Sequence, residues 1–578
     1  MDTSTTQLNI AQEDEHVFGS QFPPAPIPSD ITLPDFVLQD AEGYAEKVAF
    51  VEAVTGKQCT YSQVVRDTRR FAKALRSLGL RKGNVVIVVL PNVAEYAIVA
   101  LGIMAAGGIF SGANPASLAV EIKKQVEAAD AKLIVTSGSI YGKVKNLNLP
   151  VIILGEERIE GTIYWDELLG GGRTVPPKMI GQVTTLGLIP FFHIYGITGI
   201  CCATLRNKGK VVAMSRFDLR IFMDALISQA VTFTPIVPPI ILQLVKNPTV
   251  DEFDLSKLKL RAIMTAAAPL APDLLAAFEK KFPNVQVQEA YGLTEHSCIT
   301  LTHGDPTKEN GVAKRNSVGF VLPNLEVKFI DPETGRSLSC NSPGELCVRS
   351  ECVMLGYYNN KEETEKTIDN EGWLHTGDIG YIDDDGDIFI VDRIKEMIKY
   401  KGFQVAPAEL EAILVSHPSV NDAAVIPLPD EEAGEVPVAC VVKQPNATES
   451  EEEIMEYVAS NVAHYKKIRV LHFVDSIPKS TSGKIMRRFL KDIDGQTERV
   501  KTIGPSTTNV SYDTKFLRTT SVCMSISTFG RYIIFLFMSK LIEEIPPLVG
   551  KKQIPVAISS VTEGIGISSI NGGPFPLD

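Results

Sequence analysis

The sequence predicts an α/β protein with a large N-terminal domain and a small α+β C-terminal domain. Strand-like and helix-like segments alternate from about residue 60 to residue 236, which is typical of helix-covered, mixed or parallel sheets. After about Asn324, short strand patterns are separated by turn sequences such as DDDGD and SPGE, which indicates a β-rich subdomain. After Asp392 the pattern becomes a compact mixture of helix and strand.

The elements of the large domain follow from apolar periodicity. Residues 61–78 carry apolar positions at helical spacing, with Thr60 as N-cap and Gly79 as the stop, which predicts a helix. The run NVVIVVL at 84–90 predicts a strand buried on both faces. The other expected elements are helices over 93–106, 121–130 and 222–228, a helix ending at Leu205, and strands over 132–135, 151–154, 185–189, 210–214 and 231–236.

The small domain and the domain boundaries come next. Pro407 is expected to open a helix over 408–415, followed by strands near 423–426 and 436–442. We predict an N-terminal tail over 1–32, a large domain over 33–392, a small domain over 393–491 and a poorly ordered tail over 492–578. The last assignment rests on the lack of any repeat or helical period there.

Composition excludes several classes of function. A formal net charge of −12 argues against a broad nucleic-acid footprint, because phosphate backbones attract basic faces. Nine cysteines in 578 residues show neither metal-ligand spacing nor a disulfide framework, which favours a reducing, cytoplasmic location, with the surface of the endoplasmic reticulum left open. We expect no secretory signal, no membrane span and no peroxisomal address. The oligomeric state stays open.

Four polar, glycine-bearing segments carry the functional signal. They are QEAYGLTE at 288–295, GWLHTGDIG at 372–380, DRIKEMIKYKGFQ at 392–404 and PKSTSGKIMRR at 478–488. Each has a purely structural alternative: a strand-to-helix turn with a capping Thr-Glu pair for YGLTE, a solvated turn aspartate for TGD, and a solvated basic segment for the third. Their occurrence in one order favours a site that activates a carboxylic acid with ATP.

The first two segments contain residue types that suit a nucleotide. Gly292 permits close backbone approach, and Tyr291 offers a stacking face for adenine. Thr294 supplies a hydroxyl for the α-phosphate, and Glu295 a hard oxygen ligand for Mg²⁺. Asp378 is expected to accept hydrogen bonds from the ribose hydroxyls.

The last two segments supply positive charge. In the third, Asp392 is read as a hinge and Arg393 as a ribose contact, while Lys401 and Gly402 at a tight turn suit the phosphates of coenzyme A. Lys484 follows a Ser-Thr-Ser-Gly run, so a mobile ammonium there can reach the acyl carboxylate and the α-phosphate.

On these motifs, the chain from about Leu33 to Lys491 resembles the adenylate-forming acyl-CoA ligases, and among them plant 4-coumarate:CoA ligase-like proteins and fatty acyl-CoA synthetases. The resemblance implies that acid and ATP form an acyl-adenylate and pyrophosphate, after which the CoA thiol displaces AMP. It also implies that the small domain reorients about Asp392 between the steps. The implied ligands are ATP, CoA, Mg²⁺ and a small carboxylic acid.

The resemblance also implies site residues by motif. His193 would act at the acyl site and in catalysis, although a lone histidine after an apolar strand is more often structural. The other acyl-site residues would be Tyr195 in PFFHIYG and Ala267 and Pro269 in TAAAPL. The adenylate contacts would be Ala290, Tyr291, Gly292, Thr294, Asp378, Arg393, Lys395 and Lys484, with Thr294 and Lys484 catalytic. The CoA contacts would be Lys401, Gly402 and Arg216. At the position of Arg216 the family often has lysine. Glu289 and Ala290 replace the glutamine and glycine that the family often has there.

One departure from the family concerns the phosphates. The family places a loop of the form SSGTTGxPKG between its WDEL and HIYG segments, where it grips the β- and γ-phosphates. Here WDELL at 165–169 is followed by GGGRTVPPK and Met179, so several tens of residues are missing. Pro176 and Pro177 argue against a replacement cradle at 170–173. Because one lost oxyanion donor can cost roughly 3 to 4 kcal/mol, we expect strongly impaired adenylation.

The acyl substrate is read from the expected pocket segments 194–198, 236–241 and 265–270. They are small or aliphatic, which favours a medium- or long-chain fatty or hydroxy-fatty acid over a hydroxycinnamate. Three alternatives stay open: a hydroxycinnamate ligase, an inactive isoform that binds nucleotide or CoA, and a chain that does not fold stably.

Overall fold

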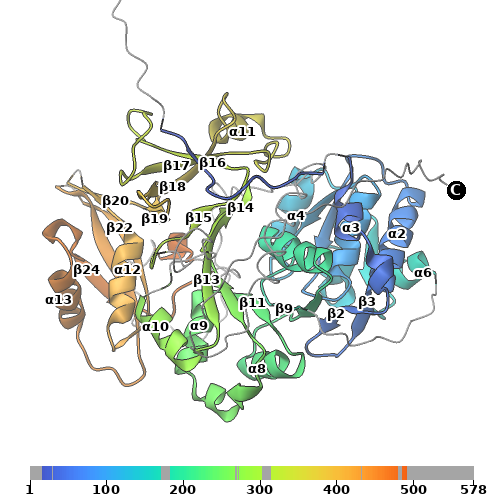
Figure 1. Cartoon of the computed structure of the whole chain (residues 1–578), viewed down its shortest axis with the longest axis horizontal. Helices are drawn as coiled ribbons and strands as arrows, with labels where there is room; N and C mark the ends of the chain where they lie inside the picture. The colour runs from blue at the N-terminus through green and yellow to red at the C-terminus, as the bar shows by residue number, and fades with distance from the viewer. Residues whose placement is uncertain are drawn as a thin grey trace, which may run out of the picture. The chain divides into compact units, whose positions relative to one another are not determined.

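The computed structural model describes residues 16–28, 30–170, 183–266, 270, 272–302, 314–401, 403–430, 432–479 and 485–490. Four β-sheets organise these residues (Figure 1). Two of the sheets are mainly parallel and carry the N-terminal half, one is antiparallel, and one belongs to the small C-terminal part. The predicted α/β fold class is confirmed.

The first sheet is five-stranded and parallel, in the order β5-β4-β6-β7-β8. Its strands are β4 (Val85–Val89), β5 (Ile109–Gly112), β6 (Leu133–Ser137), β7 (Val151–Leu154) and β8 (Ile163–Tyr164). Helices α2 (Tyr61–Ser77), α3 (Tyr96–Ala105) and α4 (Ala119–Ala128) precede β4, β5 and β6 in the chain. Thr60 caps α2 in a reciprocal capping box with Gln63, so the predicted cap is confirmed. The strand expected at 151–154 is also confirmed.

The second sheet has nine strands in the order β15-β14-β13-β12-β11-β9-β10-β2-β3. Its strands are β2 (Val48–Glu52), β3 (Gln58–Thr60), β9 (Thr184–Gly187), β10 (Lys210–Ala213), β11 (Phe233–Ile236), β12 (Ala262–Thr265), β13 (Gln286–Leu293), β14 (Ser297–Leu301) and β15 (Phe320–Val321). Strand β9 pairs in parallel with β10 and β11. The first strand after residues 171–182 therefore lies inside the sheet, with neighbours on both sides.

Helices α8 (Leu219–Ser228), α9 (Pro238–Lys246) and α10 (Pro272–Lys281) pack against this sheet. Their buried apolar residues join those of the strands in one core, which includes Leu186, Val212, Phe222, Ile263 and Phe278. Helix α8 begins three residues before the expected position, because the Asp218 side chain accepts a hydrogen bond from the Ile221 amide and caps the helix there.

The expected helix ending at Leu205 has a different geometry. It is a π-helix over Gly196–Cys202 that continues as α7 (Ala203–Arg206). Gly196 lies so close to the preceding turn that a Cβ atom would stand 2.1 Å from the Pro190 carbonyl oxygen. A π-helical turn of this kind is rare and is often found at functional sites.

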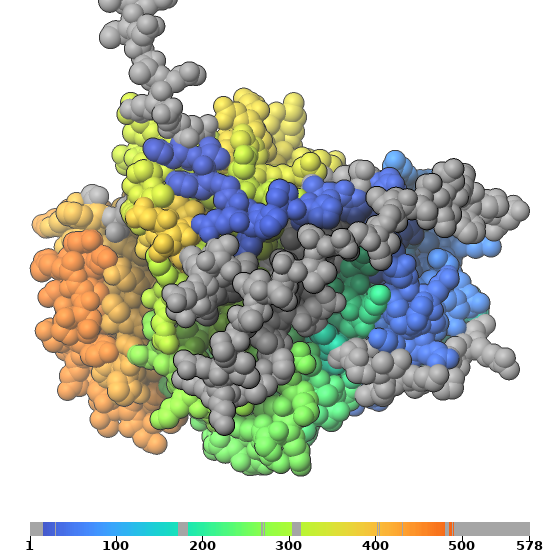
Figure 2. Space-filling view, in the orientation of Figure 1, coloured from blue at the N-terminus to red at the C-terminus, as the bar shows by residue number. Residues whose placement is uncertain are grey.

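The antiparallel sheet contains β16 (Glu326–Ile330), β17 (Gly344–Arg349), β18 (Leu374–Ile382) and β19 (Ile388–Arg393), with β1 (Phe18–Gly19) on the edge beside β16. It confirms the β-rich subdomain. Figure 2 shows the N-terminal segment, in blue, lying along this part of the surface. The Ser20 hydroxyl donates to the Val321 carbonyl, and Ala25 and Asn324 bond each other twice.

The small C-terminal part combines one sheet with two helices. Its strands are β20 (Ile398–Tyr400), β21 (Phe403–Val405), β22 (Val420–Asp430), β23 (Gly434–Lys443) and β24 (Val470–Phe473), and its helices are α12 (Pro407–Ser416) and α13 (Glu451–Asn461). The helix start at Pro407 and both expected strands are confirmed. Leu410, Leu414, Val425 and Ile454 are fully buried in its core.

The remaining described elements are short. They are α1 (Leu33–Val37), α5 (Gly138–Tyr141), α6 (Trp165–Leu169), α11 (Lys361–Thr367) and the 3₁₀ turns at Ala41–Tyr44, Pro248–Glu252, Leu255–Lys257, His464–Lys466 and Arg487–Phe489. None of the helices in the described ranges has the length and apolar character that a membrane span requires. The predicted tail over 492–578 lies outside the described residues.

Candidate active site

A tight hairpin between β13 and β14 carries the first motif. The two strands pair antiparallel with an irregularity between Tyr291 and Gly292. A Cβ atom on Gly292 would lie 1.9 Å from the Ser297 carbonyl oxygen, so only glycine fits there. The strand-to-helix alternative for YGLTE is wrong, because the chain turns at Thr294 and Glu295 and returns as β14. Thr294 is partly exposed at the hairpin tip.

Three predicted adenylate contacts meet beside this hairpin. The Tyr291 hydroxyl donates to Oδ2 of Asp378 at 2.5 Å, and Nε of Arg393 lies 3.2 Å from Oδ1 of the same carboxylate. Asp378 and Arg393 face each other as register partners on β18 and β19. The solvated-turn alternative for TGD is wrong, because Asp378 lies within a strand and is only 6% exposed.

Burial and charge determine how this arrangement behaves. Burial, reinforced by the Asp378 carboxylate, raises the pKa of Tyr291 well above its usual value, so the hydroxyl keeps its proton and donates. Both oxygens of Asp378 already have a partner, so a sugar hydroxyl can bind only by sharing or displacing one. Arg393 is 48% exposed, and its side chain is therefore the partner that is free to swing away.

Glu295 is held in place at the tip of the hairpin. Its Oε1 accepts a hydrogen bond from the Tyr357 hydroxyl at 2.8 Å, and its carbonyl accepts one from the Met354 amide. Burial and the Glu295 charge raise the pKa of Tyr357, so this donor also stays protonated. Mg²⁺ is usually held by one or two carboxylates together with substrate phosphates. One fixed carboxylate beside a nucleotide site therefore fits the expected ion.

His193 and Tyr195 lie between β9 and the π-helix. Nδ1 of His193 accepts from the Tyr195 amide at 3.2 Å, and burial lowers the pKa of the imidazole, which keeps it neutral. The Tyr195 hydroxyl donates to Sδ of Met264 on β12. Thr198 of the π-helix lies 3.4 Å from the Ser297 hydroxyl, which joins this segment to the hairpin.

Other predicted site residues are less closely grouped. Ala290 is buried on β13, while Arg216 is exposed after β10 and Lys395 is exposed in the turn after β19. Lys401 has a positive φ of 48° and donates its amide hydrogen to the Ala433 carbonyl, in agreement with the expected tight turn. Ala267, Pro269, Gly402 and Lys484 lie outside the described residues.

A buried ionic network at the start of the small domain was not predicted. Oδ2 of Asp392 accepts a hydrogen bond from the Ala408 amide at 3.0 Å, in the first turn of α12. From the same helix, Glu411 binds Arg487 with both oxygens at 2.7 and 2.8 Å. Arg487 also pairs with Glu396 and donates to the Val425 carbonyl.

This network joins the expected hinge to the lysine motif. Arg487 follows Lys484 by three residues in the sequence, so its ion pairs anchor one end of the segment that carries the predicted catalytic lysine. Burial raises the pKa of Glu411 to about 7, and the nearby guanidinium opposes that rise. The signal for this site in the sequence is Glu411, an acidic residue next to Leu410, which is buried.

Two neighbouring residues of β13 belong to the first motif but were given no site role from the sequence. Burial raises the pKa of Glu289 to about 7. Gln288 is fully buried, and neither atom of its side-chain amide has a hydrogen-bond partner within the described residues. A buried amide without a partner costs about 1–3 kcal/mol, and such groups mark places where a polar ligand atom can bind.

Known proteins match this chain in sequence and in fold. The profile of the AMP-binding enzyme family matches residues 37–167 and 171–358, and that of the AMP-binding enzyme C-terminal domain matches residues 409–484. The 4-coumarate–CoA ligase-like 1 of Arabidopsis thaliana is 68% identical over 83% of this chain and 97% of its own. The 4-coumarate–CoA ligase-like 9 of Oryza sativa subsp. japonica is 59% identical over 86% and 98%.

Among solved structures, ATP-bound MatB from Rhodopseudomonas palustris shares the fold. Its TM-score is 0.70 at 23% identity, with coverage of 80% of this chain and 99% of MatB. At that identity the likeness concerns the fold alone.

The same comparisons locate a gap. The alignment with the Arabidopsis relative spans 528 positions and uses 83% of this chain. Because 83% of 578 residues is about 480, about 50 aligned positions have no residue here. The match to the AMP-binding profile is interrupted between residues 167 and 171, at the place where the sequence lacks the expected phosphate loop.

Proposed function

This chain belongs to the AMP-binding enzyme family and is a CoA ligase by family, and we propose that it keeps the second half of the ligase reaction while the first is strongly impaired. One observation carries the proposal. The Tyr291, Asp378 and Arg393 arrangement is complete, whereas the match to the family breaks off between residues 167 and 171.

The two half-reactions place different demands on the protein. In adenylation the acyl carboxylate attacks the α-phosphorus of ATP, and negative charge grows on the departing pyrophosphate. Each donor lost from that charge costs roughly 3 to 4 kcal/mol, which is about 10² to 10³ in rate. In thioester formation the CoA sulfur attacks the acyl carbonyl, the bond to the phosphate oxygen breaks, the thiol proton leaves to solvent and AMP departs. No β- or γ-phosphate takes part.

We assign roles to residues on this basis. Asp378 accepts the ribose hydroxyls after Arg393 moves, and Tyr291 holds the carboxylate in place beside the adenine site. Thr294 binds the α-phosphate, and Glu295 holds Mg²⁺, which when bound neutralises phosphate charge. The proposed further contacts are Ala290, Gly292, Lys395 and Lys484 for the adenylate, Lys401, Gly402 and Arg216 for CoA, and His193, Tyr195, Ala267 and Pro269 for the acyl group.

For the acyl group we propose a medium- or long-chain fatty or hydroxy-fatty acid. The Met264 thioether and the aliphatic residues around Ile236 and Ile241 suit a hydrocarbon chain. The Gln288 amide favours an acid with a hydroxyl group, because it has no partner within the described residues. That feature also suits a hydroxycinnamate, which the names of the plant relatives make the second candidate.

We place the protein in the cytoplasm. Each cysteine in the described ranges is a free thiol, as is usual where glutathione keeps thiols reduced.

ATP–pyrophosphate exchange tests the impaired step. The purified full chain is assayed with fatty, hydroxy-fatty and hydroxycinnamic acids, beside a version with a family-type phosphate loop inserted between residues 170 and 183. We expect acid-dependent exchange in the restored version and at least a ~10²-fold lower rate in the chain as it stands. Equal exchange in both would overturn the proposal, and the acid that supports exchange identifies the acyl class.

A further inference from the structure

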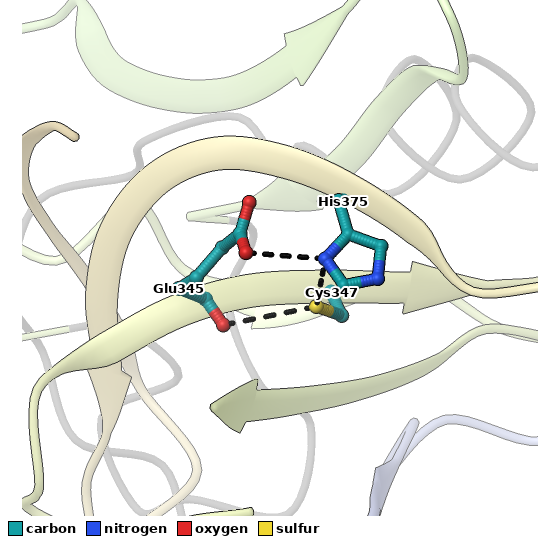
Figure 3. A group of neighbouring side chains, drawn as sticks. All are labelled: Glu345, Cys347 and His375. Carbon is teal, nitrogen blue, oxygen red and sulfur yellow. Dashed lines mark hydrogen bonds and ion pairs between the residues drawn. The ribbon is translucent and has the colours of Figure 1, made fainter. Parts of the chain in front are cut away.

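A second group of chemistry-bearing side chains lies on the antiparallel sheet. Glu345 and Cys347 are two residues apart on β17 and therefore point to the same face. His375 on β18 is the register partner of Cys347. Figure 3 shows the three side chains turned toward one another, with one ring nitrogen of His375 joined to both the carboxylate and the thiol. Nothing in the proposed ligase reaction uses them.

A bulge in β18 brings the third side chain to the other two. Between Glu345 and Cys347 the partner on β18 moves from Ile379 to His375, so β18 contains two extra residues. Gly377 lies in the bulge with a φ of 71°, a conformation that favours glycine. Its amide donates to Oε1 of Glu345 at 3.0 Å. Bulges re-aim side chains in this way beside functional sites.

The distances match the edges of a metal-centred tetrahedron. Nδ1 of His375 lies 3.1 Å from Oε2 of Glu345 and 3.6 Å from Sγ of Cys347, and the three ligand atoms all lie within 4.8 Å of one another. With zinc bonds of about 2.1 Å to nitrogen and about 2.3 Å to sulfur, tetrahedral angles place N and S about 3.6 Å apart. The corresponding N to O edge is about 3.4 Å, so the cluster's N to O distance is slightly shorter.

Outer contacts orient these ligands as they do in metal sites. Oδ2 of Asp369 lies 3.6 Å from Nε2 of His375, the ring nitrogen that faces away from the cluster. Oδ1 of Asp369 is itself fixed by the amides of Glu371 and Trp373. A metal-binding histidine usually presents its second nitrogen to a carboxylate, and a metal-binding carboxylate is usually hydrogen-bonded in turn. The Gly377 amide supplies the second feature as a hydrogen bond, and Asp369 supplies the first as an ion-pair contact at 3.6 Å.

Access and ligand type indicate which ion fits. Cys347 is fully buried beside Ile330 and Trp373, whereas the His375 side chain is 29% exposed and that of Glu345 is 13% exposed. An ion can therefore reach the group from the histidine side. Thiolate and imidazole ligands select zinc over the magnesium that uses oxygen ligands.

We propose that Glu345, Cys347 and His375 form a site for one Zn²⁺ ion, with a water molecule as the fourth ligand. Binding displaces the thiol proton of Cys347 and the proton on Nδ1 of His375, because the thiolate and an unprotonated ring nitrogen are the ligands; both protons go to solvent. The site differs from the proposed Mg²⁺ position at Glu295. The zinc ion joins β17 to β18 at the bulge before Asp378. It therefore also stiffens the strand that carries the ribose-binding carboxylate.

Cobalt titration of the full chain, freed of metal with a chelator, tests the proposal. We expect one Co²⁺ per chain, visible absorption bands of a tetrahedral site, a near-ultraviolet thiolate-to-cobalt band, and displacement by Zn²⁺. Cys347→Ala removes the charge-transfer band, and His375→Gln weakens binding at least tenfold. The matched control is Cys352→Ala, since Cys352 is also a buried free thiol nearby and its loss leaves the band intact.

The wild-type chain and the variants each give a result that can overturn the proposed zinc site. If the folded wild-type chain shows no cobalt–thiolate band at a tenfold excess of Co²⁺, the proposal is wrong. It is also wrong if the band persists in Cys347→Ala, since the metal then binds another cysteine. Should Cys347→Ala fail to fold, Glu345→Gln replaces it, and unchanged affinity in that variant overturns the assigned ligand set.

Discussion

The Tyr291 hydroxyl donates to Oδ2 of Asp378 across 2.5 Å, which ties the β13–β14 hairpin of the nine-stranded sheet to β18 of the antiparallel sheet. The two residues are 87 positions apart in the sequence, and each belongs to a different motif. The bond leaves the other carboxylate oxygen to Arg393. The position of the ribose-binding carboxylate therefore depends on both motifs.

Removing this donor is expected to weaken both the fold and the nucleotide site. Tyr291→Phe leaves a buried carboxylate oxygen without its donor, and a hydrogen bond to a charged group contributes about 1.5–3 kcal/mol. We expect a loss of that size in the free energy of unfolding, measured by urea denaturation. Tyr381→Phe on the same strand β18 is the control, because Tyr381 packs its ring against Phe389. An equal loss in both variants would contradict the assigned role of the bond.

Asp378→Asn tests the ribose assignment. The amide has the same shape but replaces one acceptor oxygen with a donor, so it no longer accepts from two sugar hydroxyls and repels the Arg393 guanidinium. We expect AMP affinity, measured by calorimetry, to fall at least tenfold. Asp384→Asn serves as the control, since Asp384 is exposed and accepts a hydrogen bond from the Asn341 side chain, away from the Asp378 carboxylate. Unchanged AMP affinity in Asp378→Asn would remove Asp378 from the site.

The ionic network around Arg487 gives a prediction about stability. Arg487→Met leaves Glu411 and Glu396 without their shared partner, and breaking a buried ion pair from one side costs about 3–5 kcal/mol. We expect a loss of that size at pH 8, where Glu411 is ionised in the wild type. The double variant Arg487→Met/Glu411→Gln should recover part of it, because the buried charge is gone. No recovery would mean that packing, and not charge, accounts for the loss.

Glu289 predicts a pH dependence with a definite sign. Its pKa is raised by burial to about 7, so the folded state binds the proton more tightly than the unfolded state. Protonated Glu289 therefore contributes about 3 kcal/mol to the free energy of unfolding. This contribution is fully present below about pH 4.5 and is lost as the pH rises through about 7. Glu289→Gln should therefore be more stable than the wild type at pH 8, and the difference should shrink at pH 5.

Urea midpoints at the two pH values measure this difference, with the exposed Glu333→Gln as the control. A difference that is the same at pH 5 and pH 8 would show that burial does not raise the Glu289 pKa.

Local patterns predicted the elements whose cause is local. The capping box of Thr60 and Gln63, the strand at 151–154 and the helix start at Pro407 all depend on a few adjacent residues. The YGLTE turn was harder, because its structural alternative was a helix. The chain forms a hairpin here because glycine at position 292 leaves room for the Ser297 carbonyl oxygen. Such a close approach of two strands cannot be predicted from the sequence of one strand.

The site was predicted where one motif carries one role and missed where roles depend on tertiary contacts. Asp378 and Arg393 were assigned separately, and their direct pairing across β18 and β19 follows from register. The partners of Arg487 come from a helix and a turn that lie 76 and 91 residues earlier. The bulge that turns His375 toward Glu345 adds two residues to one strand, which no periodicity reveals.

The retained second half-reaction is tested by supplying the full chain with pre-formed dodecanoyl-AMP and CoA and, in parallel, with dodecanoic acid, ATP and CoA. Acyl-CoA formation is measured in both reactions by chromatography. We expect acyl-CoA from the adenylate and a rate at least ~10²-fold lower from ATP, because only the second reaction needs the missing phosphate contacts. Equal rates from both, or no acyl-CoA from the adenylate, would contradict the proposed function.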